Sequence, residues 1–314
     1  MLEISVVIPV YNAEKFLERC LGSVLSSLKG VKGEIIAINN KSTDDSLTIL
    51  NRYKKEYPKI ITILDCDVVG ASATRNLGAA KAKGEYLWFI DADDAISKDA
   101  VTELLREAKK KKADFVMPGT DKYLENGEKT YLPALDPKDP EFKSKFIRRA
   151  IGPWQVIIRG EWWTKNDFRF KEGIIHEDLE VMPTLILHTD NYASVDKPLY
   201  YYYWNSNSVL HKVEWDPKYL DIFPALEGVY EHFKEAGALE TYHDELEWFF
   251  IWNLLIDSAG DFKKFKEGRK GFKRSRKMLK KYFPNWRDNR FLNQKKMGIK
   301  FKIRVILSYF GIVI

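Results

Sequence analysis

The sequence predicts an α/β fold in which a mostly parallel sheet is flanked by helices and followed by a helical C-terminal appendage. Through residues 1–117, short apolar runs alternate with helical stripes. The runs are rich in β-branched residues and apolar at successive positions, as in strands that are covered on both faces. Beyond about residue 215 the apolar residues recur with a helical period, which indicates the appendage.

The first part of the chain contains five expected strands and four expected helices. Apolar runs predict strands at 4–10, 34–39, 60–64, 85–90 and 114–117. Amphipathic stripes predict helices at 13–28, 42–57, 72–82 and 97–112. Ser42 or Thr43 is expected to cap the second helix, and Ser97 the fourth. Alternation of strand and helix is typical of a parallel sheet.

The pattern changes after residue 118. A hairpin is expected at 123–132 around Asn126-Gly127, a dipeptide favoured in tight hairpin turns. Residues 151–163 are strand-like and rich in Trp, and 176–188 are helical with an interruption at Pro183. Residues 198–204 predict a strand whose alternate tyrosine rings face the core, and a polar loop follows.

Length and composition are those of a folded protein with a main domain and a substantial addition. The chain has 314 residues, of which 45% are hydrophobic and 31% charged, whereas domains usually hold roughly 100–200 residues. The two cysteines, Cys20 and Cys66, lack metal-ligand spacing, so a reducing cytoplasm is expected. The first residues lack the basic region and long apolar stretch of a signal peptide.

Charge is distributed unevenly along the chain. Residues 263–304 hold 18 Lys and Arg against two acids, Glu267 and Asp288, whereas the rest of the chain holds 33 basic and 43 acidic residues. A basic segment on an acidic body suits an anionic lipid surface or nucleic acid. The other interpretation is a solvated helix face.

The segment 297–314 favours lipid over nucleic acid. Basic and apolar residues alternate and then give way to an apolar run of ten residues, 305–314. A membrane-spanning helix needs about 20 residues, so we expect an amphipathic segment at an anionic membrane surface. The alternative is a helix docked on the protein's own core. Aromatic residues are interleaved with the basic ones, but no nucleic-acid partner is expected, because the apolar run suits lipid better.

Three carboxylates follow the fourth expected strand, those of Asp91, Asp93 and Asp94. Ligands of open parallel sheets bind at the carboxyl ends of strands, and like charges so close together repel one another. A divalent cation would relieve the repulsion. Oxygen ligands suit Mg²⁺ or Mn²⁺, and such ions bridge carboxylates to substrate phosphates. The alternative is a cluster that caps the next helix.

Four segments in order resemble the family 2 glycosyltransferases: VVIPVYN, EIIAINNKSTDDS, GASATRNLGAAKAKGEYLWFIDADD and EGIIHEDLEVMPTLI. The resemblance covers roughly residues 1–210 and is greatest to bacterial enzymes that build surface glycans. It implies the Rossmann-like A-type nucleotide-sugar fold. It also implies a catalytic domain at 1–214, with a donor half at 1–117 and an acceptor half at 118–214, before a helical, basic region at 215–314.

The resemblance also implies a donor site. Asp91, Ala92 and Asp93 match the family's Asp-X-Asp motif, with Asp91 near the ribose, Asp93 as a metal ligand and Asp94 in support. Asp91 and Asp93 are thus the candidate metal residues. The other residues expected at the nucleotide are Pro9, Val10, Tyr11, Asn40, Gly70, Arg75, Asn76 and His211.

The resemblance places catalysis at Glu177 and Asp178, with Asp178 as the base. From the residues alone, both could instead form the acidic first turn of a helix, where the dipole favours negative charge. Trp154 is the candidate for stacking on an acceptor sugar, although an aromatic ring packs equally well in a core. His211 would touch phosphate or metal, or would simply be exposed on its loop.

One departure from the family concerns the base. The family usually has Asp-Asp-Gly-Ser after the second strand, where this chain has Asn39, Asn40, Lys41 and Ser42. An amide offers an acceptor and two donors, so Asn40 could pair with both edges of uracil, and cytosine would also fit. The substitution therefore favours a uridine donor. Lys41 indicates a reshaped loop or a weakened donor site.

These observations predict an inverting, metal-dependent glycosyltransferase at the cytoplasmic face of the membrane. It would move a sugar from a nucleotide-sugar, with a UDP-sugar favoured, to a hydroxyl of a surface-glycan or lipid-linked acceptor. Mn²⁺ or Mg²⁺ would neutralise the leaving diphosphate, and Asp178 would accept the hydroxyl proton. A nucleotidyltransferase is one alternative, but residues 9–16 lack the glycines of a triphosphate loop. A non-catalytic nucleotide-sugar-binding protein is the other.

Overall fold

The structure is a computed structural model that describes residues 1–149, 151–205 and 214–312. The chain forms two compact units. Unit 1 comprises Met1–Phe142, Gly152–Gly173 and His188–Ser206, and unit 2 comprises Lys143–Ile151, Ile174–Leu187 and Asn207–Ile314.

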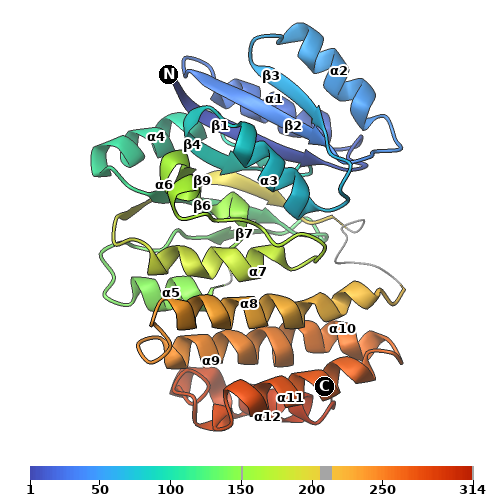
Figure 1. Ribbon diagram of the computed structural model, residues 1–314, viewed down its shortest axis with the longest axis vertical. Coiled ribbons are helices and arrows are strands. Elements are labelled where there is room, and N and C mark those ends of the chain that lie inside the picture. Colours follow the sequence, from blue (N-terminus) through green and yellow to red (C-terminus); the bar gives the residue numbers. More distant parts are fainter. Residues whose placement is uncertain (150, 206–213, 313–314) are drawn as a thin grey trace. The chain divides into compact units, whose positions relative to one another are not determined.

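Unit 1 is built on one mixed sheet in the order β3-β2-β1-β4-β8-β6-β9-β5, with β7 paired to β6 (Figure 1). The strands are β1 (Leu2–Val10), β2 (Gly33–Asn39), β3 (Ile61–Asp65), β4 (Gly84–Phe89), β5 (Ala95–Ile96), β6 (Phe115–Tyr123), β7 (Lys129–Leu132), β8 (Ile157–Arg159) and β9 (Tyr192–Tyr203). The strands β3, β2, β1 and β4 are mutually parallel, as predicted. β8 runs antiparallel to both β4 and β6, and so joins this part to the parallel pair β6 and β9.

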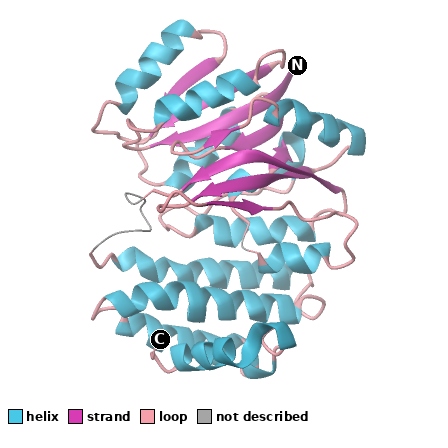
Figure 2. Ribbon diagram, turned by 180° about the vertical axis from the view of Figure 1, so that it is seen from behind, coloured by secondary structure: helices cyan, strands magenta, loops and turns pink. Residues whose placement is uncertain are grey.

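Helices cover both faces of the sheet (Figures 1 and 2). They are α1 (Leu17–Ser27), α2 (Ser46–Glu56), α3 (Ala71–Lys81), α4 (Ala100–Lys111) and α6 (Gly160–Lys165). α1, α2 and α4 bury their apolar residues against the β1 face that carries Ile4, Val6 and Ile8. On the other face, a Cβ added at Gly78 of α3 would lie 2.3 Å from Val7 Cγ1, so this helix approaches the sheet closely. Burial on both faces explains why the strands are apolar at successive positions.

Several local expectations are confirmed and others are wrong. The hairpin pairs Tyr123 with Lys129, and Gly127 has a φ of +80°. Within 151–163 only β8 is a strand, and Trp163 lies on helix α6. Its ring packs 5.6 Å from that of Phe89, and such tertiary packing outweighs the strand propensity of Trp.

The expected helix caps are also absent. α2 and α4 begin after Asp45 and Asp99, and neither helix has a side-chain cap. The hydroxyl of Ser42 instead accepts a hydrogen bond from the backbone N–H of Asn12. The Ser42 side chain, which was expected to cap α2, therefore stabilises the loop after β1 instead.

Unit 2 is helical, as predicted. Its helices are α5 (Phe142–Arg148), α7 (Glu177–Val181), α8 (Ile222–Glu235), α9 (His243–Trp252), α10 (Ser258–Lys264), α11 (Arg269–Tyr282) and α12 (Gly298–Tyr309). It also takes in 143–151 and 174–187, which the sequence assigned to the acceptor half. The reason is that α7 and the 3-10 turn after it, Met182–Leu187, pack against α8. None of the described helices has both the length and the apolar character needed to cross a bilayer.

Candidate active site

The acidic loop begins where β4 ends. The backbone N–H of Asp94 donates to the carbonyl of Asp91 at 3.1 Å, so the chain turns at once. This turn leaves Asp91 and Asp93 partly exposed, while Asp94 is fully buried. Two of the three carboxylates therefore face the carboxyl edge of the sheet, where ligands of such folds bind.

Asp91 is paired with Arg75 on α3. Nη2 of Arg75 lies 2.9 Å from Oδ1 of Asp91. The Arg75 side chain is 8% exposed and that of Asp91 31%, and the guanidinium lies 5.6 Å from the centre of the Phe170 ring. The structure thus brings together two residues that the sequence placed at the donor site.

Asp94 ties the acidic loop to β9. Its carboxylate accepts hydrogen bonds from the Tyr200 hydroxyl at 2.6 Å and from the Tyr203 backbone N–H at 2.8 Å. Burial, and then the charges of Asp91 and Asp93, hold the pKa of Asp94 well above its usual range. Asp94 therefore supports the loop from inside the unit.

Asp93 is held by a neutral donor. The amide of Asn205 donates to Oδ2 of Asp93 at 2.9 Å, and Arg19 donates to the Asp93 backbone carbonyl. Burial, and then the charge of Asp91, raise the pKa of Asp93. Burial and a second carboxylate nearby thus make the ionised form of Asp93 unfavourable in the metal-free structure.

The donor set fits a hard divalent cation with few protein ligands. Among the described residues, one group of three possible ligands has its ligand atoms within 4.8 Å of one another, and it is His243, Asp244 and Glu247 in unit 2. The carboxylates of the Asp91–Asp94 loop are not gathered as closely as that. Asp244 and Glu247 are already bound to Arg290 and Asn289. A cation at Asp93 would therefore take one or two carboxylates and complete its shell with phosphate and water, as Mg²⁺ commonly does.

The carboxyl end of β1 and the residue after it hold three candidate residues, of which one is exposed. Tyr11 is 55% exposed, whereas Val10 is fully buried and Pro9 partly so. Val10 contributes its backbone carbonyl, which accepts from the Asn40 N–H at 2.8 Å. Tyr11 is thus the side chain with surface available for a base or ribose.

Asn40 has partners other than those expected. Its amide nitrogen donates to the carbonyls of Cys66 and Val68 at 2.9 and 2.8 Å, and its oxygen accepts from Gly70 N–H at 2.8 Å. Asn40 is 4% exposed, so both amide hydrogens are used within the protein. Gly70 has a φ of +127°, a conformation that side chains rarely adopt. Asn40 therefore fixes the loop 66–70.

Asn76 and Trp154 are also used in packing. Asn76 exchanges two hydrogen bonds with the backbone of Phe170, at 2.8 and 2.9 Å. The Trp154 ring is stacked on Tyr200 at 4.6 Å and on Tyr202 at 5.7 Å between centres. Burial raises the pKa of Tyr202 to about 12. Both candidate residues are thus held by contacts within the protein.

Glu177 and Asp178 begin α7 in unit 2. Glu177 is buried and Asp178 is partly exposed, and Oδ1 of Asp178 accepts from the Leu179 N–H at 2.9 Å. Burial lowers the pKa of the preceding His176 to about 4, so this histidine is neutral at physiological pH. His211 lies outside the described residues.

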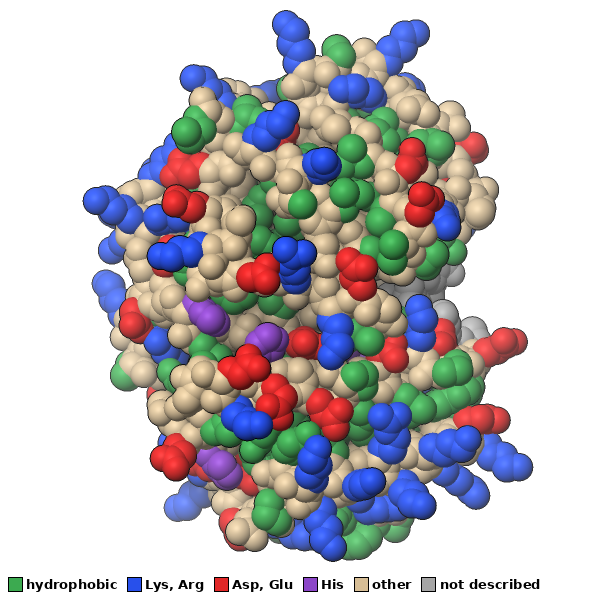
Figure 3. Space-filling model, in the orientation of Figure 1, with side chains coloured by type: hydrophobic (Ala, Val, Ile, Leu, Met, Phe, Trp, Pro, Cys, Tyr) green, Lys and Arg blue, Asp and Glu red, His purple; other side chains and the backbone are tan. Residues whose placement is uncertain are grey.

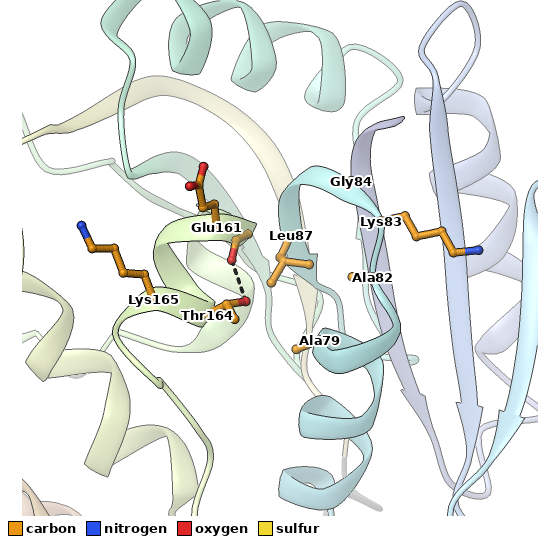
Figure 4. Close-up of a pocket in the computed structure, with 9 residues that line it drawn as sticks. Ala79, Ala82, Lys83, Gly84, Leu87, Glu161, Thr164 and Lys165 are labelled. Atoms are coloured by element: carbon orange, nitrogen blue, oxygen red, sulfur yellow. Dashed lines mark hydrogen bonds between the residues drawn. The ribbon is translucent and has the colours of Figure 1, made fainter. Parts of the chain in front are cut away.

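A separate cavity of about 450 Å³ lies at the amino end of β4 (Figure 4). β4 contributes Gly84 and Leu87 to its lining, and α6 contributes Glu161 and Thr164. Ligands of this fold class bind at the opposite, carboxyl ends of the strands. The cavity is therefore not the candidate donor site.

Sequence reasoning missed three residues that shape the acidic loop: Arg19, Tyr200 and Asn205. Tyr200 and Asn205 reach Asp94 and Asp93 across 106 and 112 positions of sequence. The guanidinium of Arg19 also lies 3.6 Å from the centre of the Tyr203 ring. Their one sequence signal is that Asn205 begins the polar loop 205–211, which also contains His211.

Known proteins share this fold and sequence pattern. The family described as "Glycosyl transferase family 2" matches residues 5–163. The poly(ribitol-phosphate) beta-glucosyltransferase of Bacillus spizizenii is 39% identical over 118 residues, which are 37% of this chain and 19% of that protein. The Mycoplasma genitalium processive diacylglycerol beta-glycosyltransferase is 23% identical over 98% of this chain and 96% of its own length.

Solved structures agree with the sequence comparison. S. aureus TarS 1–349 in complex with UDP-GlcNAc has a TM-score of 0.74 at 16% identity, covering 99% of this chain and 88% of that one. That likeness shows the fold, an A-type sheet flanked by helices with further helices at the C-terminal end. The fold and the family match together define a glycosyltransferase.

The chain belongs to glycosyl transferase family 2. The predicted family, fold class and enzyme class are thereby confirmed. The chain spans only about a fifth of the Bacillus spizizenii enzyme, so the substrates and partners of whole relatives are matters for proposal.

Proposed function

We propose that this chain is an inverting, metal-dependent glycosyltransferase that moves a sugar from a UDP-sugar to a hydroxyl of a surface-glycan or lipid-linked acceptor. The observation that carries the proposal is the loop at the end of β4. There Arg75 holds Asp91, and Asp93 has its pKa raised by burial and by Asp91. Such a loop suits a cation and a diphosphate.

The donor would bind along the carboxyl edge of β1 to β4. Mn²⁺ or Mg²⁺ held by Asp93, with Asp91 as a second oxygen ligand, would stabilise the charge of the departing nucleoside diphosphate. Arg75 keeps Asp91 oriented at this edge, and Tyr11 offers an exposed ring to the nucleoside. Asn40 acts indirectly, by fixing the loop 66–70.

The acceptor hydroxyl needs a base, and we assign that role to Asp178. Its carboxylate is partly exposed, whereas that of the neighbouring Glu177 is buried. A single displacement with Asp178 taking the hydroxyl proton inverts the anomeric carbon. Glu177 would orient the first turn of α7.

The donor and acceptor classes rest on relatives. A solved structure of the same fold is a complex with UDP-GlcNAc, and two relatives by sequence carry poly(ribitol-phosphate) and diacylglycerol in their names. The uridine argument from Asn40 loses its basis, because the amide hydrogens are engaged. Since nucleotide-sugars are cytoplasmic, we place the enzyme peripherally at the inner face of the membrane. Trp154 remains the candidate for contact with the acceptor sugar.

Calorimetric titration with UDP tests the proposal. We expect binding in Mn²⁺ or Mg²⁺ and a loss of at least about tenfold in chelator, since the cation shares the diphosphate charge. Equal affinity in chelator would contradict the metal role. Binding of UDP-sugars without hydrolysis or transfer would favour the non-catalytic protein, and release of pyrophosphate from UTP and a sugar phosphate would favour the nucleotidyltransferase.

A further inference from the structure

α12 carries a second apolar face. Its inner face buries Val305 and Ser308, and its Phe301 ring lies 6.4 Å from Trp248. The outer face nevertheless shows a stripe of large apolar side chains that are 70%, 47%, 36% and 58% exposed, in the order Ile299, Ile303, Ile306 and Phe310. The last of these, Phe310, directly follows the helix. We call these four residues the α12 stripe.

The α12 stripe is narrow and continuous. At 100° per residue its four members fall within an arc of about 60°. Among the described residues, eleven large apolar side chains are at least 36% exposed, and five of them lie within 299–312. A helix that only packs on the outside of a unit would carry polar residues on its outer face. The exposed apolar residues here therefore indicate a surface that binds another apolar surface.

Positive charge borders the stripe. Lys300 and Lys302 flank it on its two sides, at about 90° and 70° from its centre, and α12 contains no acid. α11, which contacts α12, holds eight Lys and Arg and no acid. Of these eight, Lys281 alone lies within 4.0 Å of a carboxylate among the described residues, at 3.9 Å from Glu227. Figure 3 shows Lys and Arg side chains gathered over these helices.

We propose that the α12 stripe inserts into the interface of an anionic lipid bilayer, while Lys300, Lys302 and the basic face of α11 bind the headgroups. A second copy of the chain is disfavoured, because two such basic faces would repel each other. Nucleic acid is disfavoured, because three of the four stripe residues are isoleucines, which do not stack on bases. The inference rests on the proposed function for one point, that the acceptor lies at a membrane.

Vesicle binding by the full chain tests the proposal. The vesicles are phosphatidylcholine alone, or phosphatidylcholine with about a third of phosphatidylglycerol, which supplies the negative surface potential. We expect sedimentation with the anionic vesicles, and release by salt. Ile303→Ser/Ile306→Ser should lower the partition coefficient at least about tenfold through lost apolar burial. Lys300→Glu/Lys302→Glu should lower it by a similar factor on anionic vesicles.

Matched controls come from unit 1. Leu47→Ser removes an exposed apolar side chain on α2, and Lys110→Glu/Lys111→Glu reverses two exposed charges on α4. Both should leave vesicle binding unchanged. Unchanged binding by the isoleucine variant, or equal wild-type binding to both vesicle types, would overturn the proposal. The proposal would also be overturned if the isoleucine variant lost dimer formation or binding to duplex DNA while its vesicle binding stayed intact.

The same samples separate this proposal from the proposed function. UDP affinity is measured on each variant by calorimetry in solution. If the variants lose vesicle binding and keep their UDP affinity, the result supports the α12 stripe and its basic neighbours as the lipid-binding surface. If the wild type binds vesicles normally but does not bind UDP, the result contradicts the transferase proposal and still supports the lipid-binding surface.

Discussion

Arg75 and Asp91 form a 2.9 Å ion pair that joins α3 to the end of β4. Asp91 also approaches the Tyr200 hydroxyl through its backbone N–H, at 3.4 Å. One side of the acidic loop is therefore held by an arginine and the other by β9. Arg75 favours the ionised form of Asp91, whereas burial, and then the charge of Asp91, raise the pKa of Asp93 and of Asp94.

Arg75→Ala is expected to destabilise the fold and weaken donor binding. Removing the buried cation leaves Asp91 without its partner, and breaking such pairs costs about 3 kcal/mol. Urea unfolding measures this change. Arg169→Ala is the control, since its pair with Asp167 is 75% and 79% exposed and is worth less than about 1 kcal/mol. Equal effects of the two substitutions would contradict the structural role of Arg75.

Asp93→Asn is expected to stabilise the metal-free protein and abolish metal-dependent UDP binding. The folded-state pKa of Asp93 is raised, so its protonated form is favoured. Its contribution to stability is present at low pH and is lost as the pH rises through the raised pKa. At neutral pH the amide avoids this loss because it carries no charge.

Thermal unfolding in chelator and in Mn²⁺ measures both effects. The wild type should gain stability from Mn²⁺ at neutral pH, and the gain should shrink as the pH falls through the raised pKa of Asp93. Asp93→Asn should show a higher Tm in chelator and no gain. An undiminished gain in the variant would place the cation elsewhere.

Asn40→Asp is expected to damage the site although it restores the residue usual in the family. A carboxylate has no hydrogens to donate to the carbonyls of Cys66 and Val68, and would repel both. We expect about a tenfold loss of UDP affinity from the displaced loop 66–70. Asn126→Asp in the exposed hairpin is the control for the chemical change. Improved affinity would indicate that Asn40 contacts the base.

The sequence identifies the edges of this site better than its contacts. Strand ends are predictable from apolar runs. Because parallel strands end at the same edge of the sheet, the prediction also places the Asp91–Asp94 loop at the edge where β1 and β2 end. The partners of Asp93 and Asp94 are not predictable, because Tyr200 on β9 and Asn205 just after it lie more than 100 residues away in the sequence. The role of Asn40 depends on carbonyls of an irregular loop, whose positions have no sequence pattern.

Asp178→Asn is expected to keep UDP binding and lose transfer. The amide can still accept from the Leu179 N–H, so α7 should remain folded, but it is a poor proton acceptor. General-base catalysis contributes about 10²–10⁴-fold, so turnover should fall by that factor while KM for the UDP-sugar changes little. Coupled detection of released UDP, with calorimetry for binding, measures both quantities.

Two further substitutions sharpen the assignment of Asp178. Glu240→Gln, an exposed change in the same unit, should leave turnover unchanged. Glu177→Gln alters a buried carboxylate beside the base, so it should reduce stability or turnover less steeply than Asp178→Asn. The pH profile separates a base from a packing residue, because loss of the base should remove the acid limb of kcat. Turnover retained in Asp178→Asn, or lost together with UDP binding, would remove Asp178 as the base and leave the metal role of Asp93 untouched.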